Sequence, residues 1–130
     1  IMGTWCPNCL DETVFYKGLY NAYHDQGLEI ISIGYEAGDT FQEHSKSIAR
    51  LKDKLELDFT FLVGGSARKD LASEHFYMLN KVISFRTSIY IGRDGKVKRI
   101  HTGFNGPGTG SYYSDYVKAT TALVEYLLAH

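Results

Sequence analysis

Apolar and polar residues alternate along this chain of 130 residues with two different periods. Short apolar runs rich in β-branched residues indicate buried strands, whereas longer segments with an apolar residue at every third or fourth position indicate helices. The pattern predicts helices over 7–26, 40–55, 66–79 and 111–129, and strands over 28–35 and 59–63. Two more strand-like runs, between 87 and 104, flank Asp94-Gly95, a dipeptide suited to a tight hairpin turn.

The order of these elements predicts the α/β fold class. Strands that alternate with helices imply a central sheet flanked by helices, and the hairpin adds antiparallel strands, so the sheet is expected to be mixed. The length suffices for one core, and no linker-like stretch interrupts the chain. Residues 1–130 are therefore expected to form a single domain.

Composition and charge narrow the classes of partner. Lys and Arg number 14 and Asp and Glu 15, so the net charge of −1 gives no reason to expect nucleic acid. No apolar run approaches the ~20 residues that a membrane span requires. We therefore expect no nucleic-acid partner, and no segment of this chain that spans a membrane.

The candidate chemistry lies in “GTWCPNCLDE”, residues 3–12, which holds the only two cysteines. Cys6 and Cys9 stand at the start of the first predicted helix, close enough to bridge, and Pro7 fits a first helical turn. Free N–H groups and the helix dipole stabilise an anion there, so we expect Cys6 to be the attacking thiolate. Cys9, one turn further and more buried, would resolve the mixed disulfide, with Trp5 shielding one side of the pair.

Other uses of two cysteines fit the sequence less well. A zinc site usually has four ligands, but there is no second cysteine pair and the five histidines are scattered. A purely structural disulfide would close a loop too short to gain much entropy. Attachment of a c-type haem requires histidine directly after the second cysteine, where Leu10 stands. Redox chemistry without a bound metal is the favoured interpretation.

Three stretches carry a resemblance to a known family, namely “WCPNCLDE”, “LEIISIGYE” and “SIYIGRDGKVKRIHTGF”. They resemble thioredoxin-fold proteins of the TlpA/ResA type, which are extracytoplasmic thiol–disulfide oxidoreductases of bacteria. The resemblance implies a thioredoxin-like fold and a reductase of extracytoplasmic proteins. Its partners would be protein substrates with thiols or disulfides and a redox partner dithiol that supplies electrons. It needs no organic cofactor.

The resemblance also implies roles for residues around the dithiol. Glu12 matches a glutamate that the family places near the two cysteines, which implies that Glu12 tunes a thiol pKa or relays a proton. A carboxylate in the first turns of a helix is, however, also favourable for dipole reasons alone. Trp5, Pro7 and Asn8 are expected to shape the site.

The sequence departs from the family in two places. The family has a central strand that leads into the cysteine motif, so we expect 1–4 to be a stub of that strand in a chain truncated at its N-terminus. The family also has a cis-proline facing the dithiol, where alignment puts Arg86, between Phe85 and Thr87. Because a cis bond before a non-proline residue costs roughly 2.5–4 kcal/mol, we expect a trans or rearranged peptide there. Arg86 then either favours the Cys6 thiolate or points to solvent.

Two alternative functions remain open from the sequence. Cys6 could reduce peroxide through a sulfenic acid that Cys9 resolves. The dithiol could instead capture a metal ion in a binding or chaperone module. A third possibility is a fragment without activity, because the strand that would position Cys6 is absent.

Overall fold

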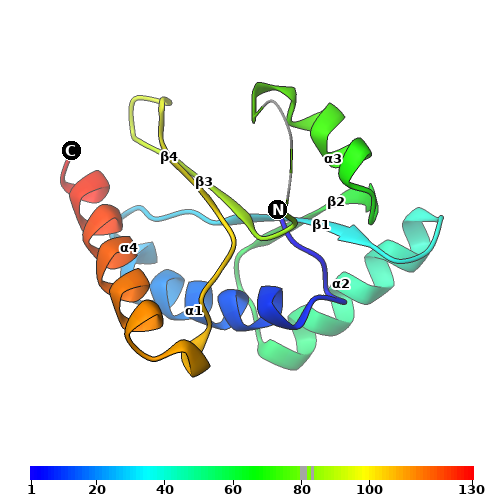
Figure 1. Cartoon of the computed structure of the whole chain (residues 1–130), viewed down its shortest axis with the longest axis horizontal. Coiled ribbons are helices and arrows are strands. Elements are labelled where there is room, and N and C mark those ends of the chain that lie inside the picture. The colour runs from blue at the N-terminus through cyan, green and yellow to red at the C-terminus, as the bar shows by residue number, and fades with distance from the viewer. Residues whose placement is uncertain (80–81, 83) are drawn as a thin grey trace.

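The computed structural model describes residues 1–79, 82 and 84–130 (Figure 1). The helices are α1 (Pro7–Tyr23), α2 (Phe41–Leu55), α3 (Lys69–His75) and α4 (Ser111–Ala129), with short 3-10 turns η1 (His24–Gln26), η2 (Tyr77–Leu79) and η3 (Pro107–Thr109). The strands are β1 (Ile31–Glu36), β2 (Thr60–Ser66), β3 (Thr87–Ile91) and β4 (Val97–Thr102). Among the residues described, no helix combines the length and apolar character needed to cross a membrane.

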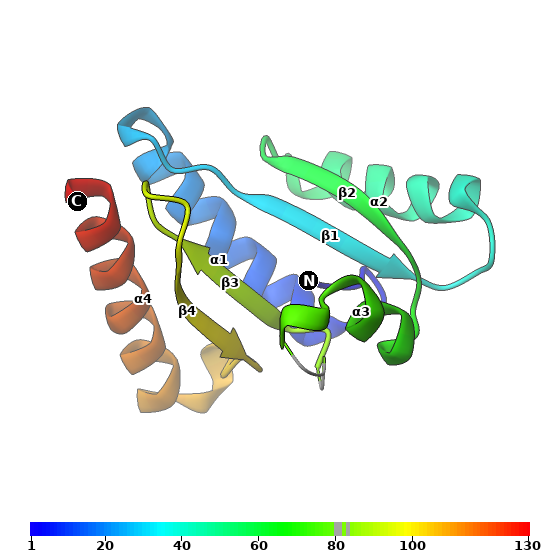
Figure 2. The ribbon, with the colours of Figure 1, turned by 90° about the horizontal axis from the view of Figure 1, so that it is seen from above.

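The strands form two ladders that the start of the chain connects. β1 pairs with β2 in parallel, and β3 pairs with β4 as an antiparallel hairpin. The N–H of Met2 donates to the carbonyl oxygen of Ile33 (2.9 Å), and the amino group of Ile1 donates to that of Thr87 (2.9 Å). The first two residues therefore lie between β1 and β3 (Figure 2) and lead directly into α1.

Two apolar clusters pack on opposite sides of the strands. One joins α1 and α2 to the sheet through Cys9, Leu51 and Phe59. The other lies under α3, around Tyr35 and Ala72. Figure 1 shows α3 on the opposite side of β1 and β2 from α1 and α2. The predicted α/β class, a mixed set of strands with helices on both sides, is confirmed.

The predicted helix over 66–79 was wrong in its first residues. β2 continues through Gly64 and Gly65 to Ser66, and the helical part is limited to α3 and η2. The reason lies in β1, because a side chain on Gly64 would sit 2.6 Å from the buried Tyr35 ring. Glycine thus lets the strand pass this ring and keep its pairing with β1 up to Ser66, although glycines in sequence usually indicate a turn.

Candidate active site

The two cysteines occupy different environments at the start of α1. Cys6 is the N-cap residue, and its sulfur accepts the N–H of Cys9 at 3.3 Å. Cys6 is half-buried, whereas the Cys9 side chain is 2% exposed. Both are free thiols. The N-cap position aims a backbone donor at the Cys6 sulfur, as a thiolate would require.

The segment that leads into Cys6 is fastened to the end of β1. The N–H of Thr4 donates to both carboxylate oxygens of Glu36 (3.1 and 2.9 Å), and the Thr4 hydroxyl donates to the same carboxylate. The Trp5 indole donates to the carbonyl oxygen of Tyr35 (2.8 Å). Gly3 gives this ring room, because a Cβ there would lie 2.3 Å from the indole nitrogen. These contacts fix the backbone immediately before Cys6.

Burial separates the chemistry of Cys9 from that of Cys6. The pKa of the Cys9 thiol is raised to about 12, mainly because the side chain is buried and also because Cys6 and Glu12 lie nearby. The backbone of Gly3 acts in the opposite direction. Cys9 is therefore a protonated thiol near neutral pH, and it needs a base before it can act as a nucleophile.

Glu12 lies on α1 one turn beyond Cys9 and is 6% exposed. Burial raises the pKa of its carboxyl to about 7, while the Tyr116 hydroxyl and the Arg86 guanidinium favour the ionised form. A carboxyl with this pKa can gain and lose a proton near neutral pH. Glu12 is thus near enough for its charge to act on the buried Cys9 thiol, and it can itself gain or lose a proton near neutral pH.

Phe85, Arg86 and Thr87 lie close to the same region. Phe85 is buried and meets the half-exposed Trp5 ring edge to face, with centroids 5.6 Å apart. The Phe85-Arg86 peptide is trans, as predicted. The Arg86 N–H donates to the Ser84 hydroxyl (3.1 Å), and the Thr87 hydroxyl donates to the Ser84 carbonyl (2.6 Å). Arg86 is half-buried, with its charge acting on Glu12.

Two of the residues predicted to shape the site lie at its edge. Pro7 and Asn8 are both exposed in the first turn of α1, between the two cysteines. The structure thus brings together Trp5, both cysteines, Glu12 and the segment from Phe85 to Thr87, and leaves Pro7 and Asn8 facing outward. Within 1–79, 82 and 84–130, no three His, Cys, Asp or Glu side chains are grouped so that they could hold a metal ion.

Comparison with known proteins gives the family. The family model described as Redoxin matches residues 1–118. The chain belongs to the Redoxin family. The predicted resemblance to thioredoxin-fold proteins of the TlpA/ResA type is confirmed by relatives of this Redoxin domain that are named thiol-disulfide oxidoreductase ResA.

The ResA of Halalkalibacterium halodurans is 29% identical over 101 residues, which cover 78% of this chain and 50% of the relative. The ResA of Bacillus thuringiensis subsp. konkukian is 29% identical over 119 residues, which cover 92% of this chain and 60% of the relative. The Redoxin domain thus spans half to three fifths of the length of these curated relatives.

A solved structure supports the fold of the Redoxin domain. A thiol:disulfide interchange protein, DsbE, from Chlorobium tepidum superposes with a TM-score of 0.62. The two sequences are 18% identical, and the match covers 91% of this chain and 74% of the DsbE chain. The predicted thioredoxin-like fold is confirmed by this likeness.

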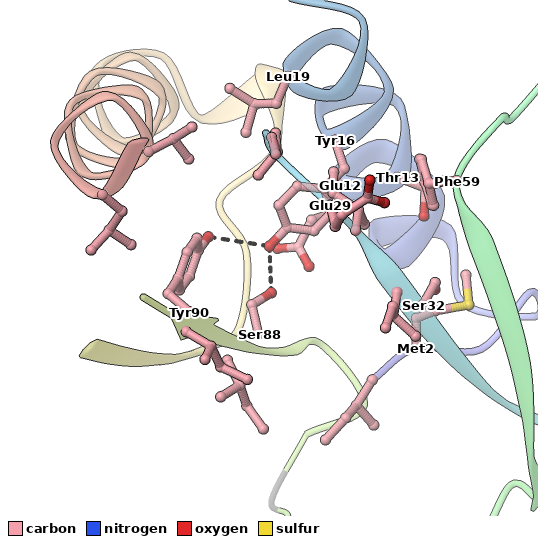
Figure 3. A pocket seen from close by; sticks show the side chains of 18 of the residues that line it. Met2, Glu12, Thr13, Tyr16, Leu19, Glu29, Ser32, Phe59, Ser88 and Tyr90 are labelled. Carbon is pink, nitrogen blue, oxygen red and sulfur yellow. Dashed lines mark hydrogen bonds between the residues drawn. The ribbon is translucent and has the colours of Figure 1, made fainter. Parts of the chain in front are cut away.

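A group of hydroxyls in the Redoxin domain was not predicted from the sequence. Tyr16 on α1 shares hydrogen bonds with the Ser88 and Tyr90 hydroxyls of β3, the latter at 3.3 Å. Tyr116 on α4 donates to a carboxylate oxygen of Glu12 at 3.4 Å. Figure 3 shows Tyr16, Ser88 and Tyr90 beside Glu12, around a cavity of about 410 Å³ that Cys9 also lines.

These residues were missed because the sequence gives them ordinary roles. Tyr116 falls on the apolar stripe of the last helix, where a tyrosine is expected to pack as a core residue. Thr4 and Glu36 lie in stretches quoted above, but nothing in the sequence indicates that they contact each other. The one available signal is that Glu36 is a charged residue directly after a buried apolar run, at the end of β1. Acidic residues at the ends of central strands often lie near a functional site.

Proposed function

We propose that this domain is a thiol–disulfide oxidoreductase that exchanges disulfides with protein substrates through Cys6 and Cys9. One observation carries the proposal: the more accessible Cys6 sulfur accepts the N–H of a buried Cys9 at the start of the same helix. This arrangement gives one thiol that a partner can reach and a second thiol that a partner cannot reach. The names of the ResA and DsbE relatives describe the same chemistry.

In the first step, the Cys6 sulfur attacks one sulfur of a partner's disulfide. A bond between Cys6 and the partner forms, the partner's own disulfide breaks, and its second sulfur leaves and takes up a proton. The Glu36 carboxylate holds Thr4, so the attacking sulfur keeps its place at the N-terminus of α1.

In the second step, Cys9 attacks the Cys6 sulfur. The Cys6–Cys9 disulfide forms, the bond to the partner breaks, and the partner's remaining sulfur leaves as a thiol. Glu12 accepts the proton of Cys9 before this attack and then returns a proton to the medium or to the leaving sulfur. Two electrons pass to the partner, and the two thiol protons balance its two new thiols.

The role we infer is that of a reductase of extracytoplasmic proteins, supplied with electrons by a partner dithiol and without an organic cofactor. The name thiol-disulfide oxidoreductase ResA supports the exchange chemistry, whereas the reducing direction and the extracytoplasmic place are what the resemblance to TlpA/ResA-type proteins implies. The reduction potential of the Cys6–Cys9 pair tests it. A value near that of thioredoxin, roughly −270 mV, agrees with a reductase, whereas a value near that of DsbA, about −120 mV, would indicate an oxidase.

The exchange itself can be tested with a synthetic peptide that contains one internal disulfide. The reduced wild type should open this disulfide and end with its own cysteines joined. The Cys9→Ser variant should accumulate an adduct of one peptide per protein through Cys6, which mass spectrometry detects. The Cys6→Ser variant should form no adduct. Reduction of the peptide by Cys6→Ser at the wild-type rate would refute the assignment.

A further inference from the structure

Tyr116 of α4 is buried among aromatic rings from three other parts of the chain. Its side chain is 6% exposed. Its ring lies 5.4 Å from that of Phe15, 5.1 Å from that of His101 and 5.2 Å from that of Phe104, measured between centroids. These neighbours come from α1, β4 and the connection to α4. The hydroxyl at the end of the ring reaches a carboxylate oxygen of Glu12.

We propose that Tyr116 is a positioning residue, which holds the Glu12 carboxylate beside Cys9 through a hydrogen bond from its phenol hydroxyl. The hydroxyl donates to one carboxylate oxygen at 3.4 Å, between two buried side chains that are 104 positions apart in the chain. A buried carboxylate must find donors within the protein, because water no longer supplies them. Tyr116 is such a donor, and aromatic rings on three sides fix its place.

The other polar groups around Glu12 come from several elements. Cys9 and Tyr16 lie on the same helix, Arg86 and Ser88 belong to β3 and the segment before it, and the amino group of Ile1 also acts on the carboxyl. Tyr90 of β3 and His101 of β4 reach the cluster through Tyr16 and Tyr116. The Tyr116 hydroxyl donates to a Glu12 oxygen at 3.4 Å, and a hydrogen bond with the Ser88 hydroxyl also favours the ionised carboxyl.

This inference rests on the proposed function for its consequence in catalysis. A donor to the carboxylate stabilises its ionised form, which is the form that accepts the Cys9 proton. Without the phenol hydroxyl, the carboxyl should hold its own proton up to a higher pH. The second step of the exchange would then require more alkaline conditions.

The first test reads Glu12 directly and does not depend on activity. The Glu12 carboxyl is titrated by ¹³C NMR in the reduced wild type and in Tyr116→Phe, which keeps the ring and its three aromatic contacts. The midpoint should rise in the variant by about one pH unit, the order expected for one hydrogen bond to a charged group. Tyr112→Phe, an exposed tyrosine on the same helix, should leave the midpoint unchanged. An equal midpoint in wild type and Tyr116→Phe overturns the proposal.

The second test separates this inference from the proposed function. The rate of Cys6–Cys9 closure from a preformed mixed disulfide is measured against pH. Its alkaline rise should move by the same unit in Tyr116→Phe, with about a fivefold loss near pH 7 and none near pH 9. A midpoint shift in the NMR titration without a shift of the rate profile would support Tyr116 as the positioning residue and refute the proton transfer through Glu12.

Discussion

The buried carboxyl of Glu12 should make the stability of the domain depend on pH in a defined window. Its pKa is about 7 in the folded protein, against 4.5 for an ordinary glutamate, and burial is the main cause. Between these two values the folded state holds a proton that the unfolded state has lost. The contribution of Glu12 to the free energy of unfolding is therefore fully present below pH 4.5. It is lost progressively as the pH rises from 4.5 through 7.

The size of this loss follows from the shift. A difference of 2.5 pKa units corresponds to about 3 kcal/mol of unfolding free energy. Glu12→Gln removes the titrating group but keeps a side chain of similar volume. The variant should thus gain about 3 kcal/mol relative to the wild type between pH 4.5 and pH 8.5.

The assay is urea unfolding of the reduced proteins at several pH values over this range. Groups that titrate in both proteins, such as Glu36, largely cancel in the difference. Glu74→Gln, an exposed glutamate on α3, serves as the matched control and should show no change of the difference with pH. The quantity to compare is the unfolding free energy of the wild type minus that of Glu12→Gln at each pH. If this difference stays constant within about 0.5 kcal/mol over the range, the desolvation of Glu12 is refuted.

Three further predictions concern the surroundings of the dithiol. Thr4→Val should cost about 1–3 kcal/mol in urea unfolding, because the buried Glu36 loses a donor, and Thr4→Ser should restore it. Gly64→Ala should lower the thermal midpoint by several degrees, because the added methyl meets the Tyr35 ring; an unchanged midpoint contradicts this. Iodoacetamide at pH 7.5 should modify Cys6 well before Cys9, and equal rates by peptide mapping would contradict their different burial.

The helices, the hairpin and the dithiol could be predicted because their signals are local. The spacing of Cys6 and Cys9, Pro7 in the first turn and the Asp94-Gly95 turn each depend on a few neighbouring residues. The extent of β2 could not be predicted in this way. It depends on how the Tyr35 ring packs over Gly64, which is a contact between two different strands.

The support of the candidate site was hidden for the same physical reason. Glu36 lies 32 positions from Thr4, and Tyr116 lies 104 positions from Glu12. No periodicity or motif encodes such pairs, because they form only when distant elements pack together. Cys6 and Cys9 could therefore be proposed as the reacting residues from the sequence, whereas the groups that fix their geometry and charge could not be predicted.

The same groups bear on the order of the two proposed steps. In the dithiol state, the pKa of Cys9 is about 12 and that of Glu12 about 7, so moving the proton from thiol to carboxylate would cost about 7 kcal/mol. Burial is the largest cause of the high Cys9 pKa, but both the hydrogen bond with Cys6 and the charge of Cys6 add to it.

Once Cys6 is bonded to a partner, its sulfur can no longer carry a negative charge, and the part of the Cys9 pKa shift that this charge causes disappears. Proton transfer to Glu12 therefore becomes less costly only after Cys6 has reacted, so Cys9 is activated when there is a mixed disulfide to resolve. Methylation of the Cys6 sulfur to a thioether imitates that state without offering a disulfide to attack. The Cys9 thiol should then titrate at a distinctly lower pH than in the unmodified dithiol, and an equal pKa of Cys9 in the two forms would refute this order of events.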